Sequence, residues 1–367
     1  MAPVSQPAVI FGGVSPEHDI SILTGLQAAR ALANAGRSPV CLYWSKAGEW
    51  HEVDAGLEAS AFADGVPRRA RPLQLVTGPG GGFFPSGGGL RKARPLEIGA
   101  ALLCCHGAPG EDGTLQAALD LAGVAYTGPD AAAAALGMDK LAFGAVAAGA
   151  GLPVLPRVAV VAEDGWAPPF PGPYIVKPRF GGSSIGIATA ADAAAVVAVA
   201  RQSVHLRAGA VAEPYLAASA DLEIAVRTYP SLELSAFAQP ERKGDIYSYQ
   251  EKYVGGEGMV SAPRTMNPTL PGSGAKVIRE TATAIAGLAR LRGVCRVDFL
   301  LDGETVYLNE VNTIPGSLAK YLWDVPFVEL LEGMLTEARE RPTTHWTTAG
   351  ADGTALRSAG SIGGKLG

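Results

Sequence analysis

The sequence is short of cysteine and of long apolar runs, and each shortage excludes a class of protein. Its 367 residues include four cysteines, none of them in a C-x-x-C pair. A disulfide framework and a cysteine zinc site are therefore not expected. No run approaches the roughly 20 uncharged apolar residues of a membrane span, and the first residues lack the basic and apolar regions of a signal peptide. We expect a protein of the reducing cytoplasm that does not bind membranes.

Positive charge is also scarce. The chain carries 30 lysines and arginines against 35 aspartates and glutamates, a formal net charge of -5. This balance provides no basic field that would attract nucleic acid. What is abundant is apolar sequence, at 48% of residues, and a chain of 367 residues is long enough for two or three domains.

The first third of the chain alternates apolar strand patterns with amphipathic helix patterns. Such alternation is typical of a parallel sheet that helices cover on both faces. A glycine-rich stretch, 78–89, is predicted to be a flexible excursion on the surface. The expected strands are 8–11, 39–44 and 100–105, and the expected helices are 21–35 and 114–121.

The pattern changes near residue 129, where an alanine-rich helical stretch begins. A long amphipathic helix is predicted over 274–291, because Ile278, Ala282, Ile285 and Ala289 share one face. A hairpin, 294–301 and 305–311, follows it. The chain after 341 is rich in Thr, Gly and Ser, so we expect it to be disordered. The other expected elements are strands at 154–161, 174–177, 210–214, 223–228 and 232–238 and a helix near 191–201.

The hairpin carries the strongest group of candidate functional residues. Side chains alternate along a strand, so Arg296 and Asp298 point one way, and Glu310 and Asn312 point one way. Together they would place two carboxylates and an amide oxygen beside an arginine, a set that suits Mg²⁺ holding a polyphosphate. The alternative is a solvated strand face with an ordinary Arg–Glu pair across the strands.

These two pairs share a face only if the turn of the hairpin has an odd number of residues. A two-residue turn would leave Glu310 on the other face. We therefore predict a three-residue turn, 302–304, which sets Asp298 opposite Leu308. Gly303 or a neighbour is expected to have a positive φ.

Four loops offer weaker signals. Lys177 ends a strand and precedes a small-residue loop, 178–186, which can cradle phosphates although its spacing is not that of a Walker A loop. The loops with Glu17 and His106 each follow a strand of the predicted parallel sheet, at the edge where ligands gather. All three could also be plain turns or surface groups. The tyrosine-rich segment 247–253 could be a lid or a solvated strand.

Taken in chain order, seven segments resemble the motifs of D-alanine–D-alanine ligases of the ATP-grasp superfamily, over roughly residues 8–340. They are FGGVSPEHDIS, CCHGAPGEDGTLQ, GMDKLAF, VKPRFGGSSIGI, YSYQEKY, CRVDFL and LNEVNTIPGS. The resemblance implies an α/β, ATP-grasp fold with the nucleotide between the central and C-terminal parts. It also implies a homodimer. The implied divisions are an N-terminal substrate domain, 1–128, a central subdomain, 129–216, a C-terminal catalytic subdomain, 217–340, and a tail, 341–367.

The resemblance implies that ATP phosphorylates the carboxylate of one D-alanine and that the amine of a second attacks the acyl phosphate. The product would be D-alanyl-D-alanine for peptidoglycan. Two alternatives remain: a ligase with another second substrate, such as D-serine, D-lactate or a natural-product amino acid, and a nucleotide-binding regulator without catalysis. Arg296, Asp298, Glu310 and Asn312 together argue against the regulator.

The resemblance also assigns roles in binding ATP and metal. It implies that Asp298, Glu310 and Asn312 hold Mg²⁺, or Mn²⁺ in its place. The residues expected around the nucleotide are Lys140, Lys177 and Lys252 at the phosphates, Glu213 and Leu216 at the adenine, and Glu223 at the ribose.

The roles implied for the amino-acid substrates follow the same pattern. Glu17 would hold the ammonium of the first substrate, oriented by Ser183 and Tyr253, with His106 nearby. Arg296 and the backbone at Gly316 would stabilise the tetrahedral centre. The match departs from the family after Gly316, where Lys320 and Tyr321 stand in the expected second-substrate region. They could bind that substrate, or simply pack or face water.

Overall fold

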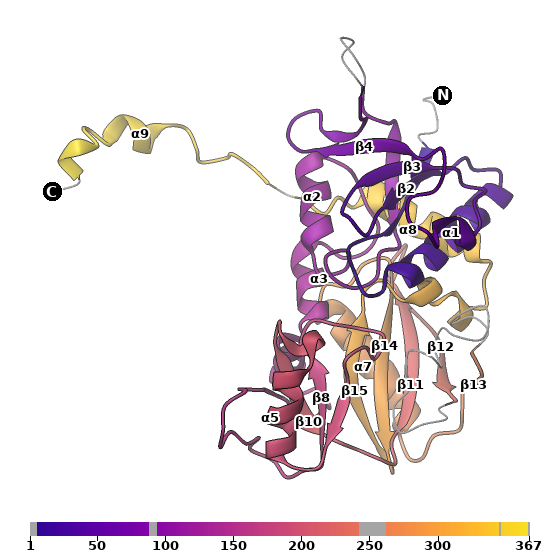
Figure 1. The fold of residues 1–367 in the computed structure, drawn as a ribbon, viewed down its shortest axis with the longest axis vertical. Coiled ribbons are helices and arrows are strands. Elements are labelled where there is room, and N and C mark those ends of the chain that lie inside the picture. Colours follow the sequence, from indigo (N-terminus) through magenta and orange to yellow (C-terminus); the bar gives the residue numbers. More distant parts are fainter. Residues whose placement is uncertain (1–5, 88–93, 242–261, 345, 366–367) are drawn as a thin grey trace.

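The computed structural model describes residues 6–87, 94–241, 262–344 and 346–365. They form an α/β protein, as predicted, and its strands are arranged in three sheets. Figure 1 shows the sheet of the first part of the chain above the two sheets of the later part. Within these residues, no helix is long and apolar enough to cross a membrane.

The first sheet has six strands in the order β5-β4-β3-β2-β1-β6. β2 and β6 flank β1 in parallel, and the remaining strands continue from β2 in antiparallel pairs. β1 is apolar and buried almost throughout, as expected for a strand covered on both faces. The elements are β1 Gln6–Gly12, α1 His18–Asn34, β2 Val40–Trp44, β3 Trp50–Val53, β4 Arg71–Val76, β5 Gly82–Pro85, β6 Ile98–Leu103 and α2 Thr114–Ala122.

The glycine-rich stretch that we expected to be a flexible excursion contains β5, which pairs with β4. Phe83 is fully buried, and its ring lies edge-on to Trp50 with 5.1 Å between the ring centroids. Glycine is needed at the preceding turn, where Gly78 has a φ of 100°. The prediction gave more weight to the glycines than to the two phenylalanines between them, whose partners in β4 and at Trp50 the local sequence does not show.

The chain returns to the first sheet near its end. α8, Phe327–Glu340, packs against β6 and α1, and Figure 1 shows it beside α1. Leu331, Met334 and Leu335 lie on one face of α8 and join the core of the first sheet. We predicted no helix here and placed the segment in the division 217–340; that division stays a prediction.

The second sheet has four antiparallel strands in the order β7-β10-β8-β9. It carries α5 on one side and forms a small core of its own. The long strand expected at 154–161 is reduced to the two residues of β7. The elements are α3 Ala131–Met138, α4 Lys140–Gly149, β7 Val158–Ala159, β8 Tyr174–Pro178, β9 Ala188–Ala190, α5 Ala193–Gln202 and β10 Ala210–Pro214.

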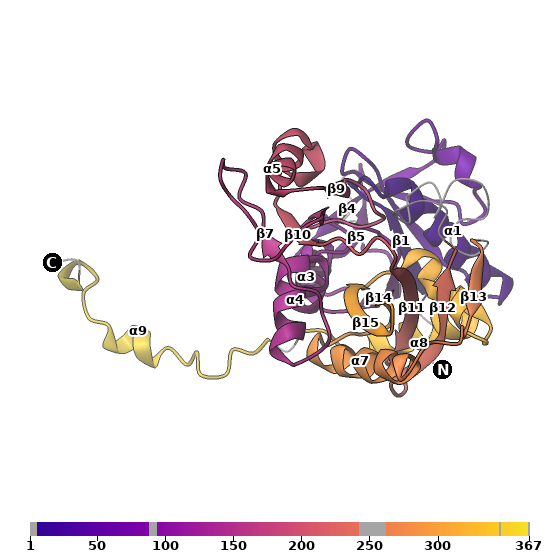
Figure 2. The same ribbon diagram turned by 90° about the horizontal axis from the view of Figure 1, so that it is seen from below.

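The third sheet has five antiparallel strands in the order β13-β12-β11-β14-β15. α7 covers it, and Figure 2 shows the helix lying along the strands. The predicted apolar face of α7 is confirmed, because Ile278, Ala282 and Ile285 are fully buried. The elements are β11 Ala220–Arg227, β12 Glu233–Pro240, β13 Arg264–Met266, α7 Gly274–Leu288, β14 Val294–Asp302 and β15 Thr305–Asn312.

The hairpin of β14 and β15 turns over two residues, so the predicted three-residue turn is wrong. Asp302 pairs with Thr305, which leaves Gly303 and Glu304 as the turn. Gly303 has the predicted positive φ, of 59°. Glycine at the first turn position is what a tight hairpin with this backbone favours.

A β-bulge in β15, and not an odd-numbered turn, places the two carboxylates on the same face of the hairpin. Phe299 pairs with Leu308, but the next pair is Asp298 with Glu310, so Asn309 is the extra residue. Without it, Asp298 would face Asn309 and Glu310 would point to the other side of the sheet. The two carboxylates therefore share a face, as predicted, for a different reason.

The tail after Arg341 leaves the body of the protein, as Figures 1 and 2 show. Its described residues contain a short α-helix, α9 Thr354–Ser358, none of whose residues is buried, and a short 3-10 helix, Gly363–Lys365. Near its start, the Thr343 Oγ1 donates a hydrogen bond to the Asp120 Oδ1 at 2.7 Å. The tail adds nothing to the three cores, and its disorder stays a prediction.

Phe83→Ala should lower the free energy of unfolding by about 3–5 kcal/mol, because a fully buried ring would leave a cavity. Unfolding by urea measures this. Leu121→Ala is the control, since Leu121 is 54% exposed and surface changes usually stay within about 0.5 kcal/mol. Equally small effects in both variants would show that β5 does not belong to the core.

Candidate active site

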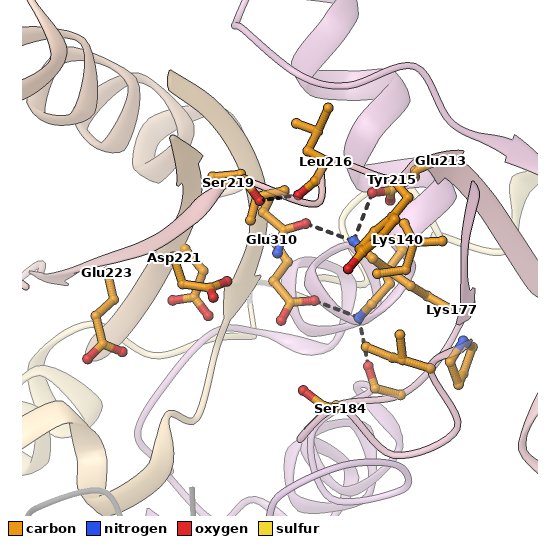
Figure 3. A pocket seen from close by; sticks show the side chains of 18 of the residues that line it. Lys140, Lys177, Ser184, Glu213, Tyr215, Leu216, Ser219, Asp221, Glu223 and Glu310 are labelled. Atoms are coloured by element: carbon orange, nitrogen blue, oxygen red, sulfur yellow. Dashed lines mark hydrogen bonds and ion pairs between the residues drawn. The ribbon is translucent and has the colours of Figure 1, made fainter. Parts of the chain in front are cut away.

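Two adjoining cavities bring the candidate residues together. The first opens between the second and third sheets, and Figure 3 shows charged side chains pointing into it. The second extends toward the first sheet, where Glu17 and His106 line it. The residues that line both cavities, and so form their common wall, are Lys140, Gly181, Gly182, Arg296 and Glu310.

Most of the residues predicted from the sequence line one cavity or the other. The first cavity also contains Lys177, Glu213, Leu216, Glu223 and Asp298. The second also contains Ser183, Asn312 and Gly316. Lys252 and Tyr253 lie outside the described residues.

Lys177 and Glu213 form a buried ion pair at the base of the first cavity. The Lys177 Nζ lies 2.8 Å from the Glu213 Oε2 and 3.0 Å from the Asn309 Oδ1. Burial by itself favours the neutral carboxyl, but the charges of Lys177 and Arg157 hold the pKa of Glu213 below its ordinary value. Glu213 is therefore a fixed negative charge that orients the lysine.

Lys140 connects the start of α4 with β15 at the common wall. Its Nζ lies 2.8 Å from the Glu310 Oε2 and donates to the Gly181 carbonyl at 2.7 Å. The preceding Asp139 caps α4 by accepting from two of its backbone N–H groups. Asp139 also binds Arg179 at 2.6 Å, so the loop after β8 and the start of α4 are held together.

Arg296 and Asp298 form a bidentate pair on one face of β14. The guanidinium donates from Nε and Nη2 to the two carboxylate oxygens, at 2.7 Å each. Its Nη1 lies 3.2 Å from the Tyr321 hydroxyl oxygen, and the Asn312 Nδ2 donates to the Asp298 Oδ2 at 2.9 Å. Glu223 lies 3.3 Å from the Arg296 Nε. Burial raises the pKa of Glu223 above its ordinary value, despite this arginine.

Glu17 and Ser183 meet across the second cavity. The Ser183 hydroxyl donates a short hydrogen bond to the Glu17 Oε1. Ser183 and Ser184 have φ values of 52° and 58°, so the loop bends sharply here through the left-handed region. The fold thus joins a residue of the first domain with the loop after β8, the pair predicted from the sequence.

His106 lines the second cavity, but both of its ring nitrogens bind the protein. Its Nδ1 lies 2.7 Å from the Ile314 carbonyl oxygen, which can only accept, so this nitrogen carries the hydrogen. The Nε2 then accepts from the Thr24 Oγ1 at 2.8 Å. Thr24 in turn accepts from the Ser317 N–H at 3.2 Å. Burial lowers the pKa of His106 to about 4, so a neutral imidazole ties α1 to the chain after β15.

Glu111 is a site residue that sequence reasoning did not single out. It lines the second cavity and accepts from the Gly107 N–H, the Ile314 N–H and the Thr313 hydroxyl, at 3.0, 2.9 and 3.2 Å. Burial, with the nearby charge of Glu17, raises its pKa to about 7. Its place in an acidic loop directly after a buried strand was the available signal. Its partners after β15 could not be found from spacing.

Lys320 and Tyr321, predicted near the second substrate, do not line either cavity. The Lys320 Nζ lies over the Phe327 ring, 5.2 Å from its centroid, so this side chain packs on α8. Tyr321 lies behind the wall of the first cavity. Its hydroxyl is 3.2 Å from the Glu223 Oε2, and the Arg264 guanidinium lies 3.7 Å above its ring centroid.

The predicted metal ligands fit a hard cation. Asp298 and Glu310 pair directly across two strands, and Asn312 bonds to Asp298 from the same face. Two carboxylates and an amide suit Mg²⁺, which takes oxygen ligands and keeps several waters. No cluster of three His, Cys, Asp or Glu side chains with the geometry of a metal site occurs in the described ranges. The predicted set, with two carboxylates, does not require one.

The three sheets and the charged cavity between the second and third define an ATP-grasp protein. Solved structures share this fold. The D-alanine-D-alanine ligase from Helicobacter pylori matches with a TM-score of 0.73 at 22% identity, over 93% of this chain and 99% of its own. The VanG D-Ala:D-Ser ligase from Enterococcus faecalis matches with 0.69 at 22% identity, over 91% and 99%.

Sequence comparison then identifies the family. Residues 6–129 match the family model described as D-ala D-ala ligase N-terminus, and 149–323 match D-ala D-ala ligase C-terminus. The D-alanine--D-alanine ligase of Bradyrhizobium sp. (strain ORS 278) is 31% identical over 353 residues, 91% of this chain and 95% of its own. That of Chlorobaculum tepidum is 30% identical, over 92% and 98%. The chain belongs to the D-alanine–D-alanine ligase family of ADP-forming ligases.

His106→Gln should be less destabilising at pH 5 than at pH 7. The folded pKa of about 4 lies below the ordinary 6.5, so the stability from neutral His106 is complete above pH 6.5 and is lost as pH falls toward 4. From pH 7 to pH 5 the wild type loses about 2 kcal/mol through this residue, which the variant cannot lose. Unfolding by urea at both pH values measures the difference.

Only the difference between the two proteins is diagnostic, because Glu111 titrates with the opposite sign. Its raised pKa of about 7 means that the folded protein gains stability as pH falls from 7 to 5. A difference between wild type and His106→Gln that does not change with pH would contradict a buried, neutral His106.

Proposed function

We propose that this enzyme joins two molecules of D-alanine into D-alanyl-D-alanine, with ATP activating the first as an acyl phosphate. One observation carries the proposal: the two cavities share a wall that contains Lys140, Arg296 and Glu310. A triphosphate in the first cavity and a carboxylate in the second would meet beside two cations. The repulsion between the anionic triphosphate and the anionic carboxylate is the main obstacle to phosphoryl transfer, and the cations would reduce it. The family role of the product is in building the cell wall.

The first cavity suits the nucleotide. Lys177 and Lys140 offer ammonium groups to the phosphates, and Lys252 is predicted to add a third. At the other end, Glu213 and the backbone near Leu216 would bind the adenine, and Glu223 would bind the ribose hydroxyls. Lys140, Lys177, Glu213 and Glu223 are between 0% and 7% exposed, so bulk water is kept away from them.

The residues at the metal position fit Mg²⁺ or Mn²⁺, which when bound would neutralise phosphate charge. Asp298, Glu310 and Asn312 would hold the metal. Arg296 and the Gly316 backbone would stabilise the charge that develops when the second amine attacks the acyl phosphate.

The second cavity suits a small amino acid. Glu17, fixed by its bond to Ser183 and predicted to be oriented also by Tyr253, would hold the ammonium group. Glu111 and His106 would shape the rest of this cavity while keeping the chain after β15 in place. The homodimer implied by the resemblance stays a prediction.

One alternative is supported by a specific observation: a ligase whose second substrate, the acceptor, is not D-alanine. The family resemblance implies a Ser-Leu pair near the positions where this chain has Lys320, Tyr321 and Leu322, and the Tyr321 hydroxyl contacts both Arg296 and Glu223. A tyrosine near that position would change how the protein binds the carboxylate or the side chain of the second substrate. D-Serine, D-lactate or another amino acid would then be the preferred acceptor.

The direct test is phosphate release from ATP and Mg²⁺ with D-alanine as the sole amino acid, with the product identified by mass. Formation of D-alanyl-D-alanine supports the proposal. Product formed solely with D-serine, D-lactate or another acceptor supports the alternative. A protein that binds ATP but releases no phosphate with any amino-acid pair would be a silent nucleotide-binding regulator.

Glu310→Gln should lower turnover by at least roughly 100-fold. Losses of this size follow even from mutating residues that only hydrogen-bond to a metal ligand. The amide keeps the size of the side chain but removes the charge that faces Lys140. Steady-state rates over a Mg²⁺ series measure this, with circular dichroism to confirm folding. Glu58→Gln is the matched control, because this carboxylate is 76% exposed and pairs with Arg30 on the surface. Near-normal turnover in Glu310→Gln would contradict the metal assignment.

Tyr321→Phe should raise the KM for the acceptor amino acid several-fold and leave the KM for ATP nearly unchanged. It keeps the ring under Arg264 and removes the hydroxyl that contacts Arg296. Lys320→Ala is the comparison, because Lys320 packs on Phe327 and its removal should leave both KM values unchanged. An acceptor effect in Lys320→Ala alone would reverse the two roles.

A further inference from the structure

Arg157 lies outside every motif that the sequence analysis identified, yet its side chain is only 4% exposed. It precedes β7 and reaches three separate elements. The Nη1 donates to the Lys140 carbonyl at 2.8 Å, at the start of α4. The Nη2 donates to the Asn309 carbonyl at 3.0 Å, in β15, and the Nε lies 3.3 Å from the Glu213 Oε1, in β10. A buried arginine with such a set of contacts joins elements whose relative position matters.

The contact in β15 falls on the β-bulge. Asn309 is the extra residue, so the regular ladder with β14 does not include it. Arg157 binds its carbonyl, and Lys177 binds its side-chain oxygen at 3.0 Å. Nearby, the Leu308 N–H donates to the Pro153 carbonyl at 2.6 Å, so the segment that carries Arg157 runs along the outer edge of β15. The bulge is held from outside the sheet.

The bulge determines which way Glu310 points. With it, Asp298 and Glu310 face each other on the cavity side; without it, Glu310 would point to the opposite face. We propose that Arg157 is a positioning residue, which holds the bulge at Asn309 and so keeps Glu310 in the wall common to both cavities.

Arginine is the side chain suited to this position. Its planar fork presents five N–H donors in fixed directions, and it stays charged when buried. A lysine would keep the positive charge near Glu213, but a single ammonium group does not reproduce the two forked bonds to separate carbonyls. The bonds to the carbonyls and the charge toward Glu213 can therefore be tested separately.

α4 is built to leave room for this side chain. A Cβ atom added at Gly144 would lie 2.4 Å from the Arg157 Cδ and 2.7 Å from its Nε. Such contacts are too short for a carbon atom, so any larger residue would push the guanidinium away. Gly144→Ala thus disturbs the position of Arg157 without changing its chemistry, and provides a second route to the same test.

The part of this inference that concerns metal rests on the proposed function; the part that concerns the bulge does not. The experiment therefore has two readouts on Arg157→Met, Arg157→Lys and Gly144→Ala. One is hydrogen exchange of the 306–312 amides in the protein without ligands. The other is binding of Mn²⁺ in the presence of ADP, followed by electron paramagnetic resonance. Arg227→Met is the matched control, because Arg227 is another largely buried arginine, paired with Glu233 away from both cavities.

We expect amide exchange in 306–312 to accelerate at least tenfold in all three variants, and Mn²⁺ binding to weaken by roughly 10- to 100-fold. Exchange in 220–227, in β11, should stay as in the wild type. Arg157→Lys should resemble Arg157→Met, because the fork and not the charge holds the bulge. In Arg227→Met, exchange in 306–312 and Mn²⁺ binding should be unchanged.

Folded Arg157 variants with wild-type exchange in 306–312 and wild-type Mn²⁺ affinity would overturn the inference. A wild type that does not bind Mn²⁺ would instead contradict the metal site of the proposed function, and exchange would still decide the role of Arg157. Should Arg157→Met fail to fold, Gly144→Ala and Arg157→Lys decide the question by the same criteria.

Discussion

The ion pair between Lys140 and Glu310 is the contact on which the arrangement of the site depends. It joins the start of α4 to β15, and its two side chains line both cavities. Burying two charges costs several kcal/mol per ion, so such a pair is retained only where further bonds support it. The Gly181 carbonyl supports the lysine, and the bulge at Asn309 orients the carboxylate. The loop after β8, the cavity face of β15 and the second cavity therefore meet at one point.

Other buried cations of the site are also paired, each with a carboxylate. Under the proposed function, a triphosphate would take the place of the carboxylate beside a lysine, and a metal ion would take the place of the cation beside a carboxylate. Arg296 illustrates this, since all three of its nitrogens bind protein groups here. The pairs are Lys140 with Glu310, Lys177 with Glu213, and Arg296 with Asp298.

Much of the fold was predictable from local pattern, and the errors have a common cause. The apolar run of β1 and the amphipathic face of α7 indicate a buried strand and a packed helix wherever the chain places them. The stretch around Phe83 was misjudged because its burial depends on a distant partner, Trp50. α8 was not predicted at all, and its packing on the first sheet likewise depends on residues far away in the sequence. The apolar pattern of one segment predicts that a face is buried, but it does not identify the residues that cover this face.

The sequence by itself determined which residues are candidates for the chemistry of the site: Asp298, Glu310 and Asn312, the proposed metal ligands, and the lysines follow from recognisable segments in order. Only the tertiary structure decided how they meet. The hairpin turn has two residues, and a bulge at Asn309 restores the register that places Asp298 and Glu310 on one face. The extra residue is accommodated here because Arg157, from outside the sheet, binds its carbonyl. Glu111 likewise gained its place from donors more than 200 residues away in sequence, and burial together with the charge of Glu17 raises its pKa.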